Sequence, residues 1–173
     1  MLKPGEGPVV PTGSEQVWVA DITYLPTQGK FVYLSLAADA WSRKIVGWSV
    51  HETLQTEQVA QALEMALKER KTSAPLIHHS DRGIQYCSDH YQQIHAWHGL
   101  TYSMTDGYDC YQNALAERIN GILKCEYLLH RPQDLKQARK MVAEAVALYN
   151  EEPPHLSLKM KTPDAVHRAS LAA

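Results

Sequence analysis

Strong positive charge is missing from this sequence. Seventeen Lys and Arg stand against 19 Asp and Glu, so the net charge is −2 and the pI is about 6.5. Autonomous nucleic-acid-binding modules are usually strongly basic. If DNA is the partner, the contacts must therefore come from local basic patches, from another chain, or through bound metal ions.

Cysteine, phenylalanine and long apolar runs are also scarce. The three cysteines, Cys87, Cys110 and Cys125, are an odd number at no metal-ligand spacing, which favours reduced thiols over a disulfide framework. Phenylalanine occurs once, and nine Tyr and four Trp supply the other aromatic side chains. No run approaches the ~18 apolar residues of a membrane span, and the first residues lack a signal-peptide core. We therefore expect a soluble, cytoplasmic protein.

Short β-rich runs followed by amphipathic helices make up most of the chain. Three runs with short connections predict an antiparallel meander, and a later run after a helix predicts a strand parallel to the first. The predicted strands cover residues 16–24, 31–38, 44–51, 75–80 and 100–104, and the predicted helices cover about 56–70, 88–99, 112–124 and 134–149. The sequence therefore predicts an α/β fold with a mixed five-stranded sheet flanked by helices.

The chain divides into three predicted segments. Residues 1–15 contain three Pro and three Gly and predict a flexible N-terminal linker. Residues 16–150 hold the strands and long helices of one core, and residues 151–173 form a C-terminal extension with a short helical end.

Two aspartates lie at the ends of strands that we expect to be neighbours. Asp21 is inside the first strand, where a buried carboxylate needs a hydrogen bond, an opposite charge or a metal ion. Asp81 follows the fourth strand. If these strands are adjacent, the two carboxylates approach one another at an edge where ligands commonly bind.

The helix predicted over 112–124 has an apolar and a polar face. Leu115, Ile119 and Ile122 form the apolar stripe, and Glu117, Asn120 and Lys124 lie on nearly the opposite side. An ordinary solvated face explains this pattern on its own. With the two aspartates nearby, Glu117 could instead complete a triangle of carboxylates.

Three clustered carboxylates repel one another by roughly 4 kcal/mol per pair at 4 Å. Such a cluster persists by protonation or by binding divalent cations. All-oxygen ligands favour Mg²⁺ or Mn²⁺ over Zn²⁺. Two such ions would activate a water or hydroxyl and stabilise the leaving oxygen in an in-line phosphoryl transfer.

The spacing and local sequence resemble a known enzyme core. Thirty-five residues separate Asp81 from Glu117. This spacing is similar to the Asp-Asp-35-Glu core of retroviral integrases and insertion-sequence transposases, and most similar to transposases of the IS-three type. The shared stretches are Trp18-Val-Ala-Asp-Ile-Thr-Tyr24, Asp39-Ala-Trp-Ser-Arg-Lys-Ile-Val-Gly-Trp48, Ile77-His-His-Ser-Asp-Arg-Gly-Ile-Gln-Tyr86 and Asn113-Ala-Leu-Ala-Glu-Arg-Ile-Asn-Gly-Ile-Leu-Lys-Cys-Glu126, with Tyr149-Asn150, Pro154-His155 and Thr162-Pro163 near the C-terminus.

This resemblance implies a ribonuclease-H-like fold and cleavage and joining of transposon DNA ends with Mg²⁺ or Mn²⁺, two ions per site. It makes Asp21, Asp81 and Glu117 the catalytic metal ligands and Lys124 a DNA contact. It also implies a homodimer or higher multimer, an upstream helix-turn-helix region outside this chain, and a cytoplasmic, nucleoid-associated location in a bacterium.

Further DNA contacts are expected around the glutamate helix. Tyr108 and Tyr111 could stack on an unpaired base, with simple packing as the equal alternative. Arg82 and Arg118, together with Lys124, could supply the basic patch that the net charge hides. The chain departs from the family pattern at Gln112 and Pro153, which bears on substrate contacts.

Other interpretations compete with this one. The enzyme could be a ribonuclease-H-like nuclease without joining activity, or the domain could be an inactive, domesticated core that acts as a DNA-associated dimerisation module. Asp39 is a rival carboxylate that fits a turn better, and Ser80 beside His79 lacks a third member for a serine hydrolase. Cys87, His90, His95 and His98 contain zinc-binding side chains, but their spacing matches no closed zinc module, and packing explains them more simply.

Overall fold

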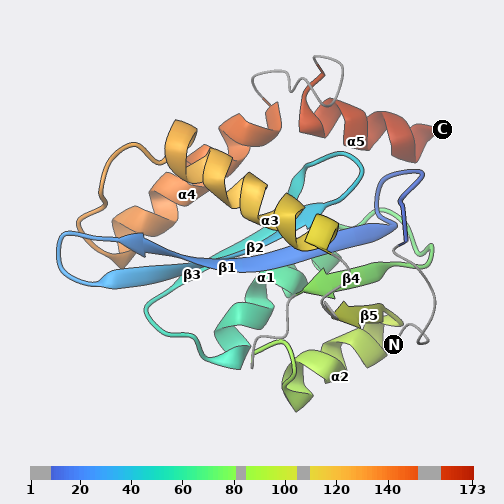
Figure 1. Cartoon of the computed structure of the whole chain (residues 1–173), viewed down its shortest axis with the longest axis horizontal. Coiled ribbons are helices and arrows are strands. Elements are labelled where there is room, and N and C mark those ends of the chain that lie inside the picture. The colour runs from blue at the N-terminus through green and yellow to red at the C-terminus, as the bar shows by residue number, and fades with distance from the viewer. Residues whose placement is uncertain (1–8, 81–84, 105–109, 152–160) are drawn as a thin grey trace.

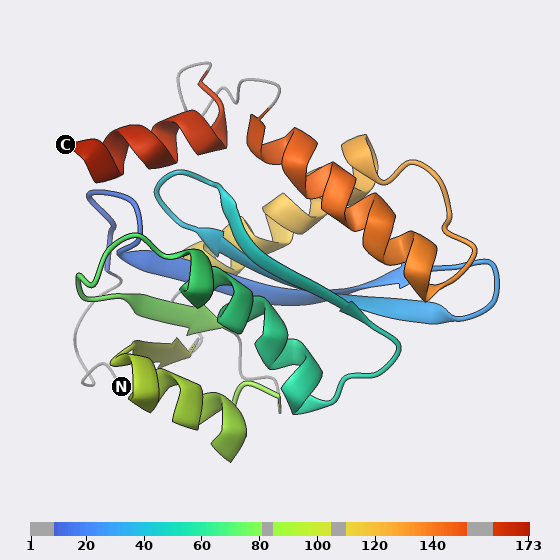
Figure 2. The same cartoon turned by 180° about the vertical axis from the view of Figure 1, so that it is seen from behind.

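A mixed sheet lies between two layers of helices in the computed structural model, which describes residues 9–80, 85–104, 110–151 and 161–173 (Figures 1 and 2). The strands are β1 (Val17–Pro26), β2 (Phe31–Asp39), β3 (Ile45–His51), β4 (Ile77–Ser80) and β5 (Thr101–Met104). Their order is β3-β2-β1-β4-β5, with β1 to β3 antiparallel and β4 and β5 parallel to β1. This confirms the predicted sheet and places β1 at its centre.

Among the described residues, five helices cover the two faces of the sheet. They are α1 (Thr56–Glu69), α2 (Asp89–His98), α3 (Cys110–Ile122), α4 (Leu135–Glu151) and α5 (Pro163–Ala172), and α3 continues into a π-helical turn, η1 (Leu123–Tyr127). Helices α1 and α2 lie on one face, and α3, α4 and α5 lie on the other (Figure 1). None of the helices in the described ranges is long and apolar enough to cross a membrane.

Strand β1 contributes side chains to two hydrophobic cores, because successive side chains point to opposite faces of the sheet. Val17, Val19 and Leu25 pack with residues of α3 and α4. Trp18 and Ala20 pack with residues of α1 and α2. Strands that are buried on both faces usually have a continuous apolar sequence. Asp21 interrupts this pattern with a charged side chain in the middle of β1.

The sequence predicts Thr56 as the N-cap of the helix over 56–70 and Leu148 on the buried face of the helix over 134–149, and both details are wrong. Thr56 does not cap α1: the N-cap is Gln55, whose carbonyl accepts from the Val59 backbone N–H, so Thr56 is already the first helical residue. Leu148 is not on the buried face of α4, because it is 48% exposed. The buried stripe continues to Tyr149 instead, at the 3.6-residue period of the helix.

A buried polar cluster joins α5 to the sheet. The Ser42 Oγ lies 2.8 Å from Nδ1 of His167, and Nε2 of His167 lies 3.3 Å from Oε1 of Glu15. Asp39 accepts hydrogen bonds from the backbone N–H groups of Ser42 and Glu15. Ser42, His167 and Glu15 are arranged like the nucleophile, base and acid of a hydrolase. Ser42 is fully buried, however, so no substrate can reach its hydroxyl. Asp39 is a turn residue, as the sequence indicated.

A second polar cluster lies beneath β4. His78 is fully buried; its Nδ1 lies 3.1 Å from Nε2 of His95, and its Nε2 lies 3.3 Å from the Tyr91 hydroxyl. Burial, and next the neighbouring His95, hold the pKa of His78 well below its usual value, and burial lowers the pKa of His95. Both imidazoles are therefore neutral at pH 7. His78 is a packing residue that fixes α2 against β4.

We expect these histidines to make the fold acid-sensitive. The unfolded chain protonates each imidazole near pH 6.5, but the folded chain does not, so the free energy of unfolding falls as the pH drops below about 6.5. Each histidine contributes a slope of up to about 1.4 kcal/mol per pH unit. Urea unfolding between pH 7.5 and 5.0 measures the slope. His78→Gln should lower this slope by the contribution of one histidine. His98→Gln, at an exposed position of α2, should leave the slope unchanged. Equal slopes in all three proteins would contradict the assignment.

Candidate active site

Asp21 lies in the middle of the central strand and contacts helix α3. Its carboxylate Oδ2 accepts a 2.8 Å hydrogen bond from the side-chain amide of Asn120. Asp21 is half-buried, and Asn120 is 4% exposed. A hydrogen bond to a charged group is stronger than one between neutral groups, so this contact fixes both the carboxylate and the helix.

The role of Asn120 differs from the sequence prediction, which placed it on the solvated face of α3. The predicted stripe of Leu115, Ile119 and Ile122 does pack in the core. The buried face is wider than predicted, because it extends to Ala116, Asn120 and Leu123. The signal in the sequence was the pair of apolar residues, Ala116 and Leu123, on the side of the helix next to Asn120.

Glu117 and Arg118 lie on the exposed side of α3. Glu117 is three residues before Asn120, so the two side chains project from one face of the helix, one above the other. Because Asn120 is bonded to Asp21, this part of α3 lies against β1, and Glu117 is one helical turn before the contact.

Lys124 reaches back across β1 from the π-helical turn. Its Nζ lies 3.2 Å from the Thr23 hydroxyl and 3.1 Å from the Tyr24 carbonyl, and 5.0 Å from the centre of the Tyr24 ring. In η1 the N–H of Leu128 bonds the carbonyl of Leu123, five residues earlier. π-Helical turns re-aim side chains and are frequent at functional sites. Here the turn places the Lys124 ammonium beside Thr23 and Tyr24, which follow Asp21 on β1 by two and three residues.

Several predicted site residues lie outside the described part of the chain. These are Asp81, Arg82 and Tyr108; Tyr111 is in α3, but its side chain is not described. The parallel register pairs Val19 with His79. In the sequence, Asp21 follows Val19 by two residues, and Asp81 follows His79 by two residues.

A groove of about 310 Å³ runs along β1 beside Asp21. It is lined by Asp21, Ile22, Thr23, Tyr24, Tyr33, Leu54, Gln85 and Tyr86. The groove beside Asp21 is therefore open to solvent rather than enclosed.

The histidines of α2 do not form a metal centre. His95 turns inward to His78, while His90 lies 3.9 Å from Glu64 and Cys87 is exposed. Across the described residues, no group of three or more His, Cys, Asp or Glu side chains is arranged to hold a metal ion. Ser80 is buried and bonded to the Tyr102 hydroxyl, which removes the serine-hydrolase alternative.

We expect Asn120→Ala to destabilise the protein by about 1.5–3 kcal/mol, because it removes a hydrogen bond to a charged, partly buried group. Asn120→Asp should cost more at pH 7, since it sets two carboxylates side by side, and should recover part of the loss at pH 4. Urea unfolding measures both effects. Asn113→Ala, at a half-buried position near the start of α3, is the matched control. Wild-type stability in both Asn120 variants would contradict the contact.

Comparison with known proteins decides the family. A family model described as integrase core domain matches residues 11–110, and a second model with the same description matches residues 98–163. The chain belongs to the integrase core domain family. This integrase core is 40% identical over 157 residues to the insertion element IS600 uncharacterized 31 kDa protein of Shigella sonnei, covering 90% of this chain and 58% of that protein. It is 42% identical over 115 residues to the transposase InsF for insertion sequence IS3A of Escherichia coli, covering 66% of this chain and 40% of that protein.

The predicted resemblance to insertion-sequence transposases is thus confirmed, and the chain spans about half the length of these relatives. Among solved structures, the HTLV-2 integrase catalytic core domain in complex with magnesium has a TM-score of 0.72 at 20% identity, covering 90% of this chain and 98% of that one. The catalytic core domain of BIV integrase has a TM-score of 0.70 at 17% identity, covering 91% and 97%. These similarities confirm the ribonuclease-H-like fold of this integrase core.

Proposed function

We propose that this chain is the catalytic core of an insertion-sequence transposase, which cleaves transposon DNA ends and joins their 3′-hydroxyls to target DNA. Residues 16–150 would form the core, between an N-terminal segment at 1–15 and a C-terminal extension at 151–173. The end of the first segment is not a free linker, because Glu15 is buried against Asp39 and His167. The observation that carries the proposal is the Asn120–Asp21 hydrogen bond, because it sets the Glu117 helix against the central strand beside Asp21.

The proposed metal ligands are Asp21, Asp81 and Glu117. The donor set fits Mg²⁺ or Mn²⁺, because carboxylate oxygens are the ligands that these ions prefer. Asp21 is half-buried and held by an amide donor, and Glu117 is exposed one turn before that donor on α3, so both carboxylates remain able to bind a cation. Two bound ions would lower the pKa of an attacking water and offset the charge on the departing oxygen.

The protein's own groups position the DNA in this proposal. Asn120 orients the Asp21 carboxylate, and the ammonium of Lys124, held between Thr23 and Tyr24, would contact a phosphate. Arg118 and Arg82 would add phosphate contacts, and Tyr108 and Tyr111 would stack on an unpaired base. No protein nucleophile is required.

The reaction consists of two displacements at phosphorus. In cleavage, a water oxygen forms a bond to phosphorus, the bond from phosphorus to the 3′-oxygen breaks, and a free 3′-hydroxyl results. In joining, that hydroxyl oxygen attacks a target phosphodiester, and the target's own 3′-oxygen departs with a proton. Neither step uses an oxidant or an external energy source.

A branched oligonucleotide that imitates the joined product tests the proposal. The reverse of joining uses the same groups, so the chain with Mn²⁺ should release the transposon strand and reseal the target strand. Hydrolysed fragments without resealing would favour the nuclease alternative. No reaction under conditions in which the chain binds DNA would favour the inactive core.

The partners follow from the same proposal. Joining two transposon ends requires at least two active sites, so the working assembly would be a homodimer or a higher multimer. Recognition of the terminal repeats would belong to a helix-turn-helix region upstream of this chain. The site of action would be the bacterial nucleoid.

A further inference from the structure

The end of the β1–β2 hairpin carries two exposed aromatic rings. Tyr24 is 56% and Phe31 is 58% exposed, and their ring centres are 5.3 Å apart in an edge-to-face arrangement. Phe31 is the single phenylalanine of the sequence, so the chain exposes a side chain type that it uses nowhere in its core. Exposed apolar groups that gather in one place usually mark an interaction site.

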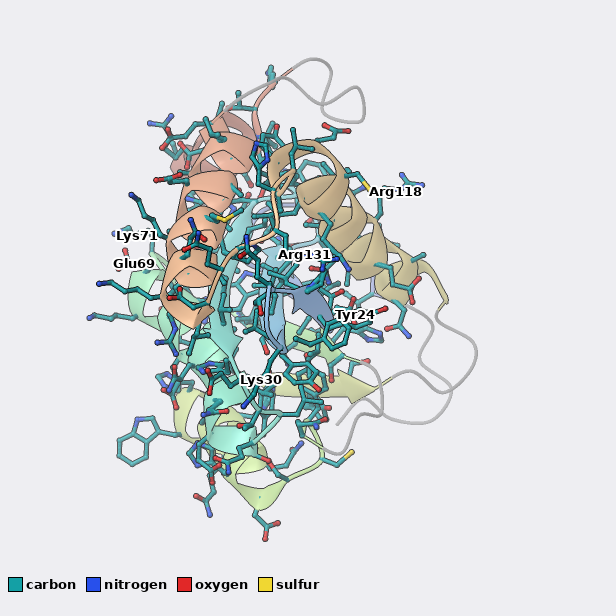
Figure 3. The ribbon with its side chains drawn as sticks, turned by 90° about the vertical axis from the view of Figure 1, so that its left-hand side faces the viewer. Tyr24, Lys30, Glu69, Lys71, Arg118 and Arg131 are labelled. Carbon is teal, nitrogen blue, oxygen red and sulfur yellow. The ribbon has the colours of Figure 1, made fainter. Side chains whose placement is uncertain are left out.

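Cationic side chains lie at the same end of the molecule as this aromatic pair (Figure 3). The Lys124 Nζ lies 5.0 Å from the centre of the Tyr24 ring. Lys124 and Arg131 line a hollow of about 290 Å³ together with apolar residues that include Leu25 and Leu129. The N–H of Gln28 at the hairpin turn donates to the carbonyl of Pro132, which joins the hairpin to the loop that carries Arg131.

These residues form one surface at the hairpin end. We call it the hairpin-end patch: Tyr24, Lys30, Phe31, Lys124 and Arg131. Figure 3 looks onto this end of the molecule, with Tyr24, Lys30 and Arg131 directed toward the viewer. All but the partly buried Lys124 are exposed.

The patch is positive although the whole chain carries a net charge of −2. Neither the hairpin segment 22–33 nor the loop segment 127–133 contains an acidic residue, and the acids that flank the loop are Glu126 and Asp134. Cations spaced around exposed rings are typical of surfaces that bind single-stranded nucleic acid, because bases stack on the rings while phosphates contact the cations.

We propose that the hairpin-end patch binds a single-stranded stretch of DNA that continues from the proposed active site. Tyr24 is three residues after Asp21 on β1, a distance of about 10 Å along a strand, so one DNA strand reaches both. Tyr24 and Phe31 stack on bases, and Lys30, Lys124 and Arg131 contact the phosphates. This inference rests on the proposed function, since it extends the path of the same DNA strand.

Binding of fluorescent oligonucleotides by the full chain tests the patch, with Ca²⁺ present so that cleavage does not interfere. The probes are a blunt duplex and the same duplex with a single-stranded tail. We expect the tail to tighten binding, and the double variant Tyr24→Ser/Phe31→Ser to remove that gain, at least about tenfold. Tyr24→Trp should retain it. Trp97→Ser, which removes an 87% exposed ring on α2, is the matched control.

The cations have a separate readout. Lys30→Ala/Arg131→Ala should lower the slope of log affinity against log salt concentration by about 0.7 for each phosphate that a cation no longer neutralises. Tails with 5-iododeoxyuridine should crosslink to Tyr24 or Phe31 on irradiation, because stacking brings the halogenated base against the ring.

Three outcomes would overturn the inference: no gain from the tail in the wild type, an unchanged gain in the double variant, or a double variant that loses self-association with DNA binding intact. The last result would assign the patch to a second copy of the chain. The branched-DNA reaction is scored separately. If the chain reseals the target strand but the patch variants bind the tail as the wild type does, the proposed function stands and only this inference is refuted.

Discussion

Asp21→Asn is expected to abolish the reaction with branched DNA, with a loss of about 10³-fold or more. The amide has the shape of the carboxylate but lacks the charge that would hold a divalent cation. Metal-ion stabilisation of a phosphoryl transition state is worth several kcal/mol, and each 1.36 kcal/mol is a factor of ten in rate. Single-turnover rates with Mn²⁺ and saturating DNA measure the loss.

The controls separate metal binding from folding. Asn at position 21 still accepts the hydrogen bond from Asn120, so the urea midpoint should stay close to wild type. Mn²⁺ should raise the thermal stability of the wild type and not of Asp21→Asn, since a ligand of the folded state stabilises it. Glu117→Gln should match Asp21→Asn in rate, whereas Glu126→Gln, an exposed carboxylate on η1, should react normally. A fully active Asp21→Asn would refute the metal site.

Gly47→Ala is expected to cost about 3 kcal/mol or more in the free energy of unfolding. A Cβ on Gly47 would lie 2.0 Å from the backbone carbonyl oxygen of Ala62 and 3.0 Å from the Ala66 Cβ. Strand β3 can approach α1 this closely only without a side chain at residue 47. A backbone atom cannot rotate away, so the helix or the strand must move, and overpacking of this kind is strongly destabilising.

Gly29→Ala is the matched control for this prediction. Nothing lies within 4 Å of the position that its Cβ would take, at the turn between β1 and β2. It should therefore unfold within about 0.5 kcal/mol of wild type, as surface substitutions usually do. Urea unfolding by circular dichroism compares the three proteins. Equal midpoints for Gly47→Ala and the wild type would show that α1 does not pack this closely on β3.

The sequence was most informative where a regular pattern repeats. The apolar runs of β1 to β3, the helix over residues 88–99 and the crossover to β4 could all be predicted, because each depends on local chemistry or on the handedness of chain connections. The boundaries of the strands differ from the prediction by one or two residues. Leu148 was misplaced because the apolar residues of α4 fit two neighbouring stripes, and contact with the sheet buries the one that ends at Tyr149.

The polar contacts between distant segments were not readable in the same way. Asn120 was assigned to solvent because it lies beside the stripe of Leu115, Ile119 and Ile122 rather than in it. Only packing against β1 shows that the buried face extends as far as Asn120. The cluster of Glu15, Ser42 and His167 joins residues from both ends of the chain, and no local pattern reports such a meeting.

The sequence by itself determined the sheet, the order of its elements and the family, because periodicity and motif spacing are local properties that survive without knowledge of packing. The tertiary structure decided that the buried side of α3 includes Asn120, whose amide is thereby bonded to Asp21. It also decided that Tyr24 and Phe31 stay exposed together. Both outcomes depend on the angle at which a helix or a hairpin meets its neighbours, which is set by side-chain contacts across the whole fold.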